Sequence, residues 1–314
     1  MTGRSPRAVL LMTYGSPASL DDIDRYLAAV RGGRSADPAL VEEFRRRYRV
    51  IGGSPLIERT REQASALEQR LGDGTIVRAA MRFSEPSIDA VVHELAGADV
   101  QRAAGIVLSP QFSPLLMGGY GQAVETARAA IGPGAPDVAI AGPWHREPAF
   151  VEALGARIRD ALLADGAGGV GDPVLLTAHS LPLRVAEREP DYLDQLRETA
   201  ELAAAAAALA DGQWTFCWQS AGHEPGEWMA PDFADLMPRL RAAGHRRVVV
   251  APVQFLADHL EILYDIDVGA RQQAEAVGLA FRRTASLNDD PGLVNALAAV
   301  ARRALEHEGA AAPP

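Results

Sequence analysis

The sequence predicts an α/β fold of two similar doubly wound, Rossmann-like halves, each built on a parallel sheet, with a cleft between the halves. Short β-branched and apolar runs alternate with longer amphipathic stretches, which is the pattern of strands joined by crossover helices. The strand-like runs form two sets of four, with a break near Gly142-Pro143-Trp144. We therefore expect an amino-terminal half at 1–143 and a carboxy-terminal half at 144–314, with the option that the last helix packs back on the first half.

The expected elements follow one another along the whole chain. Strands are expected at 8–14, 75–81, 104–109, 137–141, 173–178, 213–219, 246–253 and 278–283. Helices are expected at 19–31, 38–50, 55–71, 86–96, 120–131, 148–164, 191–209, 231–243, 259–275 and 290–307. Because helical stretches separate the strands, the sheets should be parallel and covered by helices on both faces.

Composition narrows the class of protein. The chain has 314 residues, of which 48% are hydrophobic and 23% charged, as in an ordinary soluble globular protein. The formal net charge of -10 argues against a nucleic-acid partner, because binding to polyphosphate requires a basic face.

Localisation and cofactor class follow from what the sequence lacks. There is no apolar run of about 18 or more residues, so no integral membrane segment is expected. The start of the chain has no signal-peptide pattern, which predicts a cytoplasmic protein. The single cysteine, Cys217, excludes an intrachain disulfide and an iron–sulfur cluster held by four cysteines of this chain.

Two polar residues, His179 and Glu261, stand where functional groups are expected. His179 follows the expected strand 173–178, and Glu261 lies shortly after the strand 246–253. Open α/β sheets bind their ligands beyond the carboxyl ends of the strands, so both side chains should reach one crevice. An imidazole and a carboxylate that meet there can bind a divalent transition metal or move protons.

Each of these residues also has an ordinary structural interpretation. A histidine at a strand end is often a hydrogen-bonding group, and Glu261 could serve as a first-turn acid of a helix that begins near His259. His259 is not expected to share a helical face with Glu261, since neighbours on a face are about three or four residues apart. Asp265, four residues after Glu261, is expected on the same face, where it could be an exposed helical acid.

Several short segments together point to one family. They are residues 10–17 (LLMTYGSP), 45–48 (RRRY), 51–56 (IGGSPL), 177–182 (TAHSLP), 218–220 (WQS) with Trp228, and 257–265 (ADHLEILYD). In order and spacing, over nearly the whole chain, they resemble the ferrochelatases, which insert ferrous iron into a porphyrin. The resemblance is greatest to the soluble coproporphyrin III ferrochelatases of Gram-positive type, on the grounds of Tyr14, the short length and the lack of a carboxy-terminal membrane segment.

The resemblance implies a metal chelatase of the lyase class that acts in haem biosynthesis. Its substrates would be coproporphyrin III and Fe²⁺, its product coproheme, and it would hold no permanent cofactor. The porphyrin would lie in the cleft, bent out of plane so that pyrrole lone pairs turn toward the metal. Transient contact with neighbouring enzymes of the haem pathway is also expected.

The resemblance also implies roles for single residues around the metal. His179 would accept pyrrole protons and contact the metal on one porphyrin face, and Glu261 would face His179 and hold Fe²⁺ or relay protons outward. Tyr14 would be the axial ligand of porphyrin iron on the other face. Asp265 would lie on the approach path of metal or protons. Gly269 stands where some relatives have a further acid, which predicts a weakened or missing outer metal site.

A second set of residues is implied as partners of the porphyrin itself. Its propionate groups require charged or hydrogen-bonding side chains. The family pattern assigns propionate contacts to Arg31, Arg47, Tyr48, Ser54 and Tyr120. Apolar walls for the macrocycle are expected from Met12, Ile51, Leu56 and Phe112. The turn that holds Ser54 is one residue shorter than the family's Gly-Gly-X-Ser, which leaves the register of that serine open.

Three alternatives stay open at this point. Protoporphyrin IX, with two propionates instead of four, is the alternative substrate. A cobalt chelatase would favour a second histidine at the metal, for which His223 is the candidate. A non-catalytic porphyrin or haem carrier is disfavoured, because a carrier has no need of a proton acceptor such as His179 opposite the axial ligand.

Overall fold

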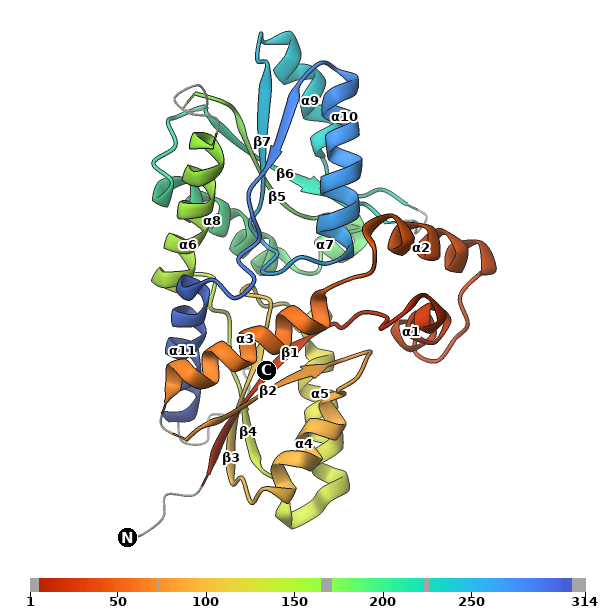
Figure 1. The fold of residues 1–314 in the computed structure, drawn as a ribbon, viewed down its shortest axis with the longest axis vertical. Helices are drawn as coiled ribbons and strands as arrows, with labels where there is room; N and C mark the ends of the chain where they lie inside the picture. Colours follow the sequence, from red (N-terminus) through yellow and green to blue (C-terminus); the bar gives the residue numbers. More distant parts are fainter. Residues whose placement is uncertain (1–5, 73, 165–170, 223–225, 307–314) are drawn as a thin grey trace. The chain divides into compact units, whose positions relative to one another are not determined.

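The computed structural model describes residues 6–72, 74–164, 171–222 and 226–306. The chain divides into two compact units, Met1–Trp144 with Asn288–Pro314, and His145–Leu287. The first unit therefore includes the last helix, α11 (Pro291–Glu306), which contacts α3 (Leu56–Leu71) and β3 (Arg102–Val107) (Figure 1). The segment after residue 287 thus belongs with the amino-terminal part of the chain.

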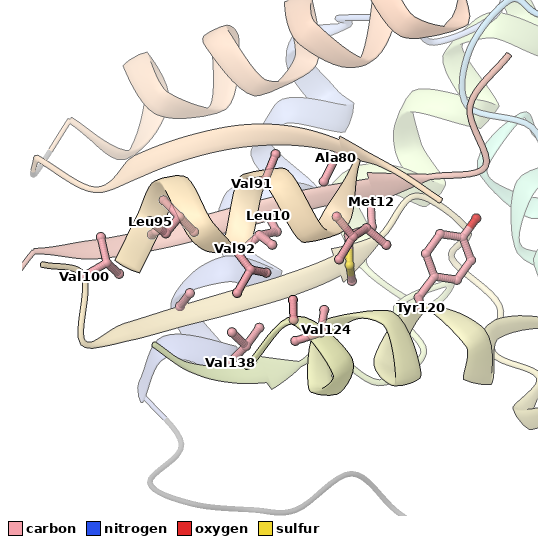
Figure 2. Packing of buried hydrophobic residues seen from close by; sticks show 14 of the residues in the cluster. Leu10, Met12, Ala80, Val91, Val92, Leu95, Val100, Tyr120, Val124 and Val138 are labelled. Carbon is pink, nitrogen blue, oxygen red and sulfur yellow. The ribbon is translucent and has the colours of Figure 1, made fainter. Parts of the chain in front are cut away.

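The first unit is built on a parallel sheet of four strands. Its order is β2-β1-β3-β4, with β1 at Arg7–Thr13, β2 at Ile76–Met81 and β4 at Asp137–Ile140. Successive side chains of a strand point to opposite faces. Ala8, Leu10 and Met12 of β1 accordingly share one buried cluster with side chains of α4 (Ile88–Gly97) and α5 (Pro114–Ile131) (Figure 2).

The other helices of this unit complete its two-sided cover. α3 contacts β1 and β2, and α11 contacts β3 and β4. The remaining pair, α1 (Ile23–Val30) and α2 (Pro38–Ile51), contact each other and the short 3-10 helix η1 (Leu20–Asp22). α2 begins at Pro38 because Asp37 accepts a hydrogen bond from the Ala39 N–H, and it ends at Ile51 because the next residue, Gly52, has a left-handed backbone with a φ of 74°.

The second unit repeats the same strand order. Its parallel sheet runs β6-β5-β7-β8, with β5 at Val174–His179, β6 at Trp214–Gln219, β7 at Arg247–Pro252 and β8 at Ala280–Arg283. α6 (Pro148–Leu163) and α8 (Pro190–Ala206) pack on each other and on this sheet. A second cluster of buried side chains joins the sheet to α9 (Phe233–Ala242), α10 (Arg271–Ala276) and the π-helix η4 (Glu261–Ala270).

The eight expected strands are all present, each end within two residues of its expected position. The helices differ more: the one expected at 19–31 is η1 followed by α1, and α8 ends at Ala206 instead of 209. α5 begins at Pro114 instead of 120, because the Ser113 side chain caps it by accepting from the Leu116 N–H at 3.0 Å. A short helix, α7 (Leu183–Ala186), was not expected, and the single helix expected at 259–275 is η4 followed by α10. No helix of the described residues is long and apolar enough to cross a membrane.

Gly155 provides a test of the contact between α6 and α8. A Cβ atom added there would lie 2.6 Å from the Ala206 Cβ and 2.8 Å from the Ala206 carbonyl carbon. Because helix backbone would have to move, we expect Gly155→Ala to lower the free energy of unfolding by about 1–3 kcal/mol. Thermal denaturation followed by circular dichroism measures the effect.

Gly97→Ala is the matched control, since nothing lies within 4 Å of a Cβ at the end of α4. We expect that change to be neutral or to stabilise by up to about 1 kcal/mol. Equal melting temperatures for the two variants would contradict the close approach of α6 to α8.

Candidate functional site

His179 is the last residue of β5, at the carboxyl end of a central strand of the second unit. Its ring Nδ1 lies 2.5 Å from the Ser180 carbonyl oxygen. A carbonyl can only accept a hydrogen bond, so Nδ1 carries the proton and Nε2 of the neutral ring has the free lone pair. This Nε2 lies 3.7 Å from Oε1 of Glu261, and the His179 side chain keeps 30% of its surface exposed. The ring is therefore oriented with its basic nitrogen toward the carboxylate.

His259 approaches Glu261 in the same manner from the other side. Its Nδ1 lies 2.9 Å from the Ala257 carbonyl oxygen, and its Nε2 lies 3.5 Å from Oε2 of Glu261. This contact was not predicted from the sequence, because only the spacing along a regular helix that begins near His259 was considered. In the structure η4 begins at Glu261, and His259 lies in the segment before it, so the residue spacing of a helix does not determine where its side chain points.

The two histidines control the charge of the carboxylate. Burial opposes ionisation of Glu261. This effect is outweighed by the positive charge of His179 and by the hydrogen bond and charge of His259, so the pKa of Glu261 is lowered to about 2. Burial opposes a positive charge on the His259 ring. The pKa of His259 is nevertheless raised above its ordinary value, by Glu261, the Ala257 carbonyl and Asp265. Glu261 is thus a carboxylate at neutral pH, placed between two imidazole nitrogens.

An arginine holds the segment that carries Glu261. Arg283, at the end of β8, binds Asp267 of η4 through two hydrogen bonds of 2.8 and 2.9 Å. The same guanidinium lies 3.4 Å from Asp258, which also accepts from the Ser286 hydroxyl at 2.7 Å. Only 14% of the Arg283 side chain is exposed, so these are largely shielded contacts. They fix the residues on both sides of Glu261 to the edge of the sheet.

Asp265 lies half-buried on η4, one turn after Glu261. Its charge contributes to the raised pKa of His259, so it belongs to the same electrostatic group. Within the described part of the chain, no set of three or more His, Cys, Asp or Glu side chains is arranged to hold a metal ion. The metal contacts assigned to His179, Glu261 and Asp265 therefore stay predictions, and His223 lies outside the described residues.

In the first unit, Tyr14 directly follows β1 and is 41% exposed. Its ring meets that of Phe83 edge-on, with centroids 4.6 Å apart, and the Phe83 N–H donates to the Tyr14 carbonyl at 3.1 Å. The backbone contact follows from parallel pairing of β1 and β2, whose carboxyl ends lie side by side. Tyr14 is thus an exposed phenol that is held from one side.

Arg82 is a neighbour that the sequence reasoning missed. Its guanidinium carbon lies 4.8 Å from the ring centre of Phe83 and 5.4 Å from that of Tyr120. Gly119 makes room for it, because a Cβ there would lie 1.9 Å from an Arg82 nitrogen. Arg82 directly follows β2, so the rule that selected the ends of other strands would also have found it.

The expected propionate partners differ in how far they are exposed. Tyr120 and Tyr48 are buried, at 5% and 4% exposure, and burial raises the pKa of Tyr120. Arg31 ends α1 in an exposed position. Ser54 is half-buried, and its hydroxyl accepts from the Leu56 N–H at 3.4 Å. Among the residues expected as apolar walls, Ile51, Leu56 and Phe112 are half-buried, whereas Met12 is fully buried in the core (Figure 2).

Arg47 shares a single acid with its neighbour Arg46. Both donate to Glu43 on α2, at 2.8 Å each, and their hydrogen bonds, first that of Arg46 and then that of Arg47, lower the pKa of Glu43 to about 2. The two arginines differ in exposure: 50% of the Arg46 side chain is accessible but only 20% of that of Arg47. This difference makes them a natural pair for comparison.

The lowered pKa of Glu261 predicts a pH-dependent contribution to stability. A carboxyl group with a folded-state pKa of about 2, below its usual 4.5, stabilises the fold fully above pH 4.5 and loses this effect as the pH falls toward 2. We expect wild type and Glu261→Gln to differ in melting temperature at pH 5 to 6 and to converge as the pH falls from about 4.5 toward 2. A difference that stays constant over this range would contradict the ion pairs with the histidines.

Comparison with known proteins places the chain in a family. The family model described as Ferrochelatase matches residues 6–305. A ferrochelatase of Deinococcus radiodurans is 38% identical over 96% of this chain and 97% of its own length. A coproporphyrin III ferrochelatase of Geobacillus kaustophilus is 35% identical over 96% of both chains. The solved structure of SirB from Bacillus subtilis with Fe³⁺ shares the fold, with a TM-score of 0.63, 13% identity and 96% of each chain covered. The chain therefore belongs to the ferrochelatase family, the metal-inserting chelatases of the lyase class.

Proposed function

We propose that this protein inserts Fe²⁺ into coproporphyrin III, forming coproheme and releasing two protons. The observation that carries the proposal is the placement of the Glu261 carboxylate between the Nε2 atoms of His179 and His259 at the edge of the second sheet. Insertion requires that two pyrrole N–H protons leave as the metal enters. In this arrangement His179 is the base that accepts a proton, and the negative charge of Glu261 stabilises the positive charge that results. The name of the relative from Geobacillus kaustophilus supports coproporphyrin III as the substrate.

The proposed proton path begins at His179. Its Nε2 lone pair is free because Nδ1 is committed to the Ser180 carbonyl. A carboxyl group with a pKa of about 2 does not retain a proton at neutral pH, so Glu261 acts by stabilising the imidazolium that forms and by guiding Fe²⁺. Because the Glu261 carboxylate lies next to both rings, the proton passes through it briefly from His179 to His259, whose pKa is raised, and then moves on toward Asp265.

The first unit would bind the porphyrin. Tyr14 offers an exposed phenol oxygen as axial ligand of the porphyrin iron. Arg31, Arg47, Tyr48, Ser54 and Tyr120 are proposed to bind propionates. Arg47 is suited to this role because only 20% of its side chain is exposed, and an ion pair with a carboxylate is weakened less by water where it is partly buried.

Substitutions in the two sets of residues should affect different properties, either iron insertion or the binding of the porphyrin and its iron. We expect His179→Ala to abolish iron insertion and Glu261→Gln to lose most activity, while both still bind porphyrin, because each removes proton chemistry and leaves the first unit unchanged. Tyr14→Phe should keep porphyrin affinity and alter the visible spectrum of bound coproheme. Anaerobic assays with Fe²⁺ and coproporphyrin III, read by absorbance, test all three variants. Near-normal turnover in folded His179→Ala would contradict the assignment.

Substrate choice is tested by the two arginines that share Glu43. We expect Arg47→Ala to raise the dissociation constant for coproporphyrin III about 5- to 150-fold, because a partly desolvated propionate loses a charged partner worth about 1–3 kcal/mol. The loss should be smaller for protoporphyrin IX, which carries fewer propionates. Fluorescence titration with both porphyrins measures these constants.

Arg46→Ala is the control, because it breaks a contact to the same acid on the same helix but removes the more exposed side chain. We expect it to change neither constant by more than about 2-fold. Equal losses for both porphyrins in Arg47→Ala would favour protoporphyrin IX as the substrate.

A further inference from the structure

Gln254 lies where β7 leaves the sheet beside His179. The Val253 N–H still donates to the Thr177 carbonyl at 3.1 Å, as in a regular parallel ladder. The next bond of such a ladder would run from the His179 N–H to the Val253 carbonyl. Instead, the His179 N–H donates to Oε1 of the Gln254 side chain at 2.7 Å. A side-chain amide thus completes the ladder at the residue that carries the imidazole.

The other end of the same amide is also anchored. Nε2 of Gln254 donates to the hydroxyl oxygen of Tyr192 at 2.7 Å. Tyr192 lies on α8 with 3% of its surface exposed, and burial together with the charges of Glu261 and Glu189 raises its pKa. Because an amide NH₂ can only donate and its oxygen can only accept, the two partners fix the orientation of the Gln254 side chain. The amide therefore joins β5, α8 and the segment that leads to η4.

We propose that Gln254 is a positioning residue, which holds His179 at the distance from Glu261 that proton transfer requires. The inference rests on the proposed function of His179 and Glu261. Both Gln254 and Glu261 lie in the chain segment that follows β7, so the amide connects the strand carrying the base to the segment carrying the carboxylate. The 3.7 Å between His179 Nε2 and Glu261 Oε1 leaves little tolerance, since displacement of a reacting group by about 1 Å can lower a rate about 100-fold.

Gln254→Met removes both hydrogen bonds while keeping a side chain of similar length. We expect kcat for iron insertion to fall about 10- to 100-fold, with the KM for porphyrin changed less than about 2-fold, because the porphyrin partners lie in the first unit. Gln254→Glu keeps an oxygen that accepts from the His179 N–H, so it should retain more of kcat than Gln254→Met. Amide hydrogen exchange at His179 should be faster in Gln254→Met than in wild type.

The matched control is Gln213, which likewise makes a hydrogen bond with each end of its amide, in this case to two backbone groups. It accepts from the Ala210 N–H and donates to the Asp172 carbonyl, each at 3.1 Å, beside the start of β6 at the opposite end of the sheet. Gln213→Met should leave kcat and hydrogen exchange at His179 unchanged. If Gln213→Met lowered kcat as much as Gln254→Met, a general loss of stability would explain both results and the proposal would be overturned.

Tyr192→Phe tests the far anchor and covers the case in which Gln254→Met does not fold. We expect a smaller fall in kcat in the same direction, and in the double variant with Gln254→Met a combined effect below the product of the two single effects. Independent, multiplicative effects, or unchanged kcat in both folded variants, would overturn the role of Gln254. Absence of iron insertion by the wild-type protein would instead contradict the proposed function, so the two failures are distinguishable.

Discussion

The chemistry proposed for the second unit depends on the hydrogen bonding of β5, a central strand between β6 and β7. Buried main-chain groups must be paired, and β5 is paired on both sides as far as its last residue, His179. On the side of β6, the Ser180 N–H donates to the Gln219 carbonyl at 2.7 Å. On the other side, where β7 has ended, the His179 N–H donates to the Gln254 side chain. The imidazole is therefore attached to backbone that cannot shift without loss of several bonds.

Charge balance around Glu261 follows from the same arrangement. A protein with a formal charge of -10 gathers several acids on one segment, Asp258, Glu261, Asp265 and Asp267 among them. Arg283 binds the first and the last of these, and leaves Glu261 to the two histidines. Removing one partner of such a shielded pair leaves a charge uncompensated, so the acids that bind Arg283 contribute to the position of η4 rather than to proton transfer.

The two units use one topology for different chemistry. The strand orders β2-β1-β3-β4 and β6-β5-β7-β8 make β1 and β5 equivalent, and each leads to a candidate ligand of iron, Tyr14 after β1 and His179 at the end of β5. Around Tyr14 the neighbours are aromatic rings and Arg82, whereas around His179 they are a carboxylate and a second imidazole. The fold thus supplies an equivalent edge twice, and the residues at each edge decide what it can do.

The amino-acid sequence by itself determined the strands, their division into two sheets and the sheet edge at which His179 and Glu261 meet. These features are local: runs of β-branched residues predict strands, and a polar residue at the end of such a run predicts where the functional edge lies. The sequence did not determine the π-helix, the approach of His259 to Glu261, or the bridge made by Gln254. Each depends on groups distant along the chain, such as Arg283, that meet when the strands pair. Spacing along an assumed regular helix could not predict them, because tertiary contacts decide where that helix begins and how it is wound.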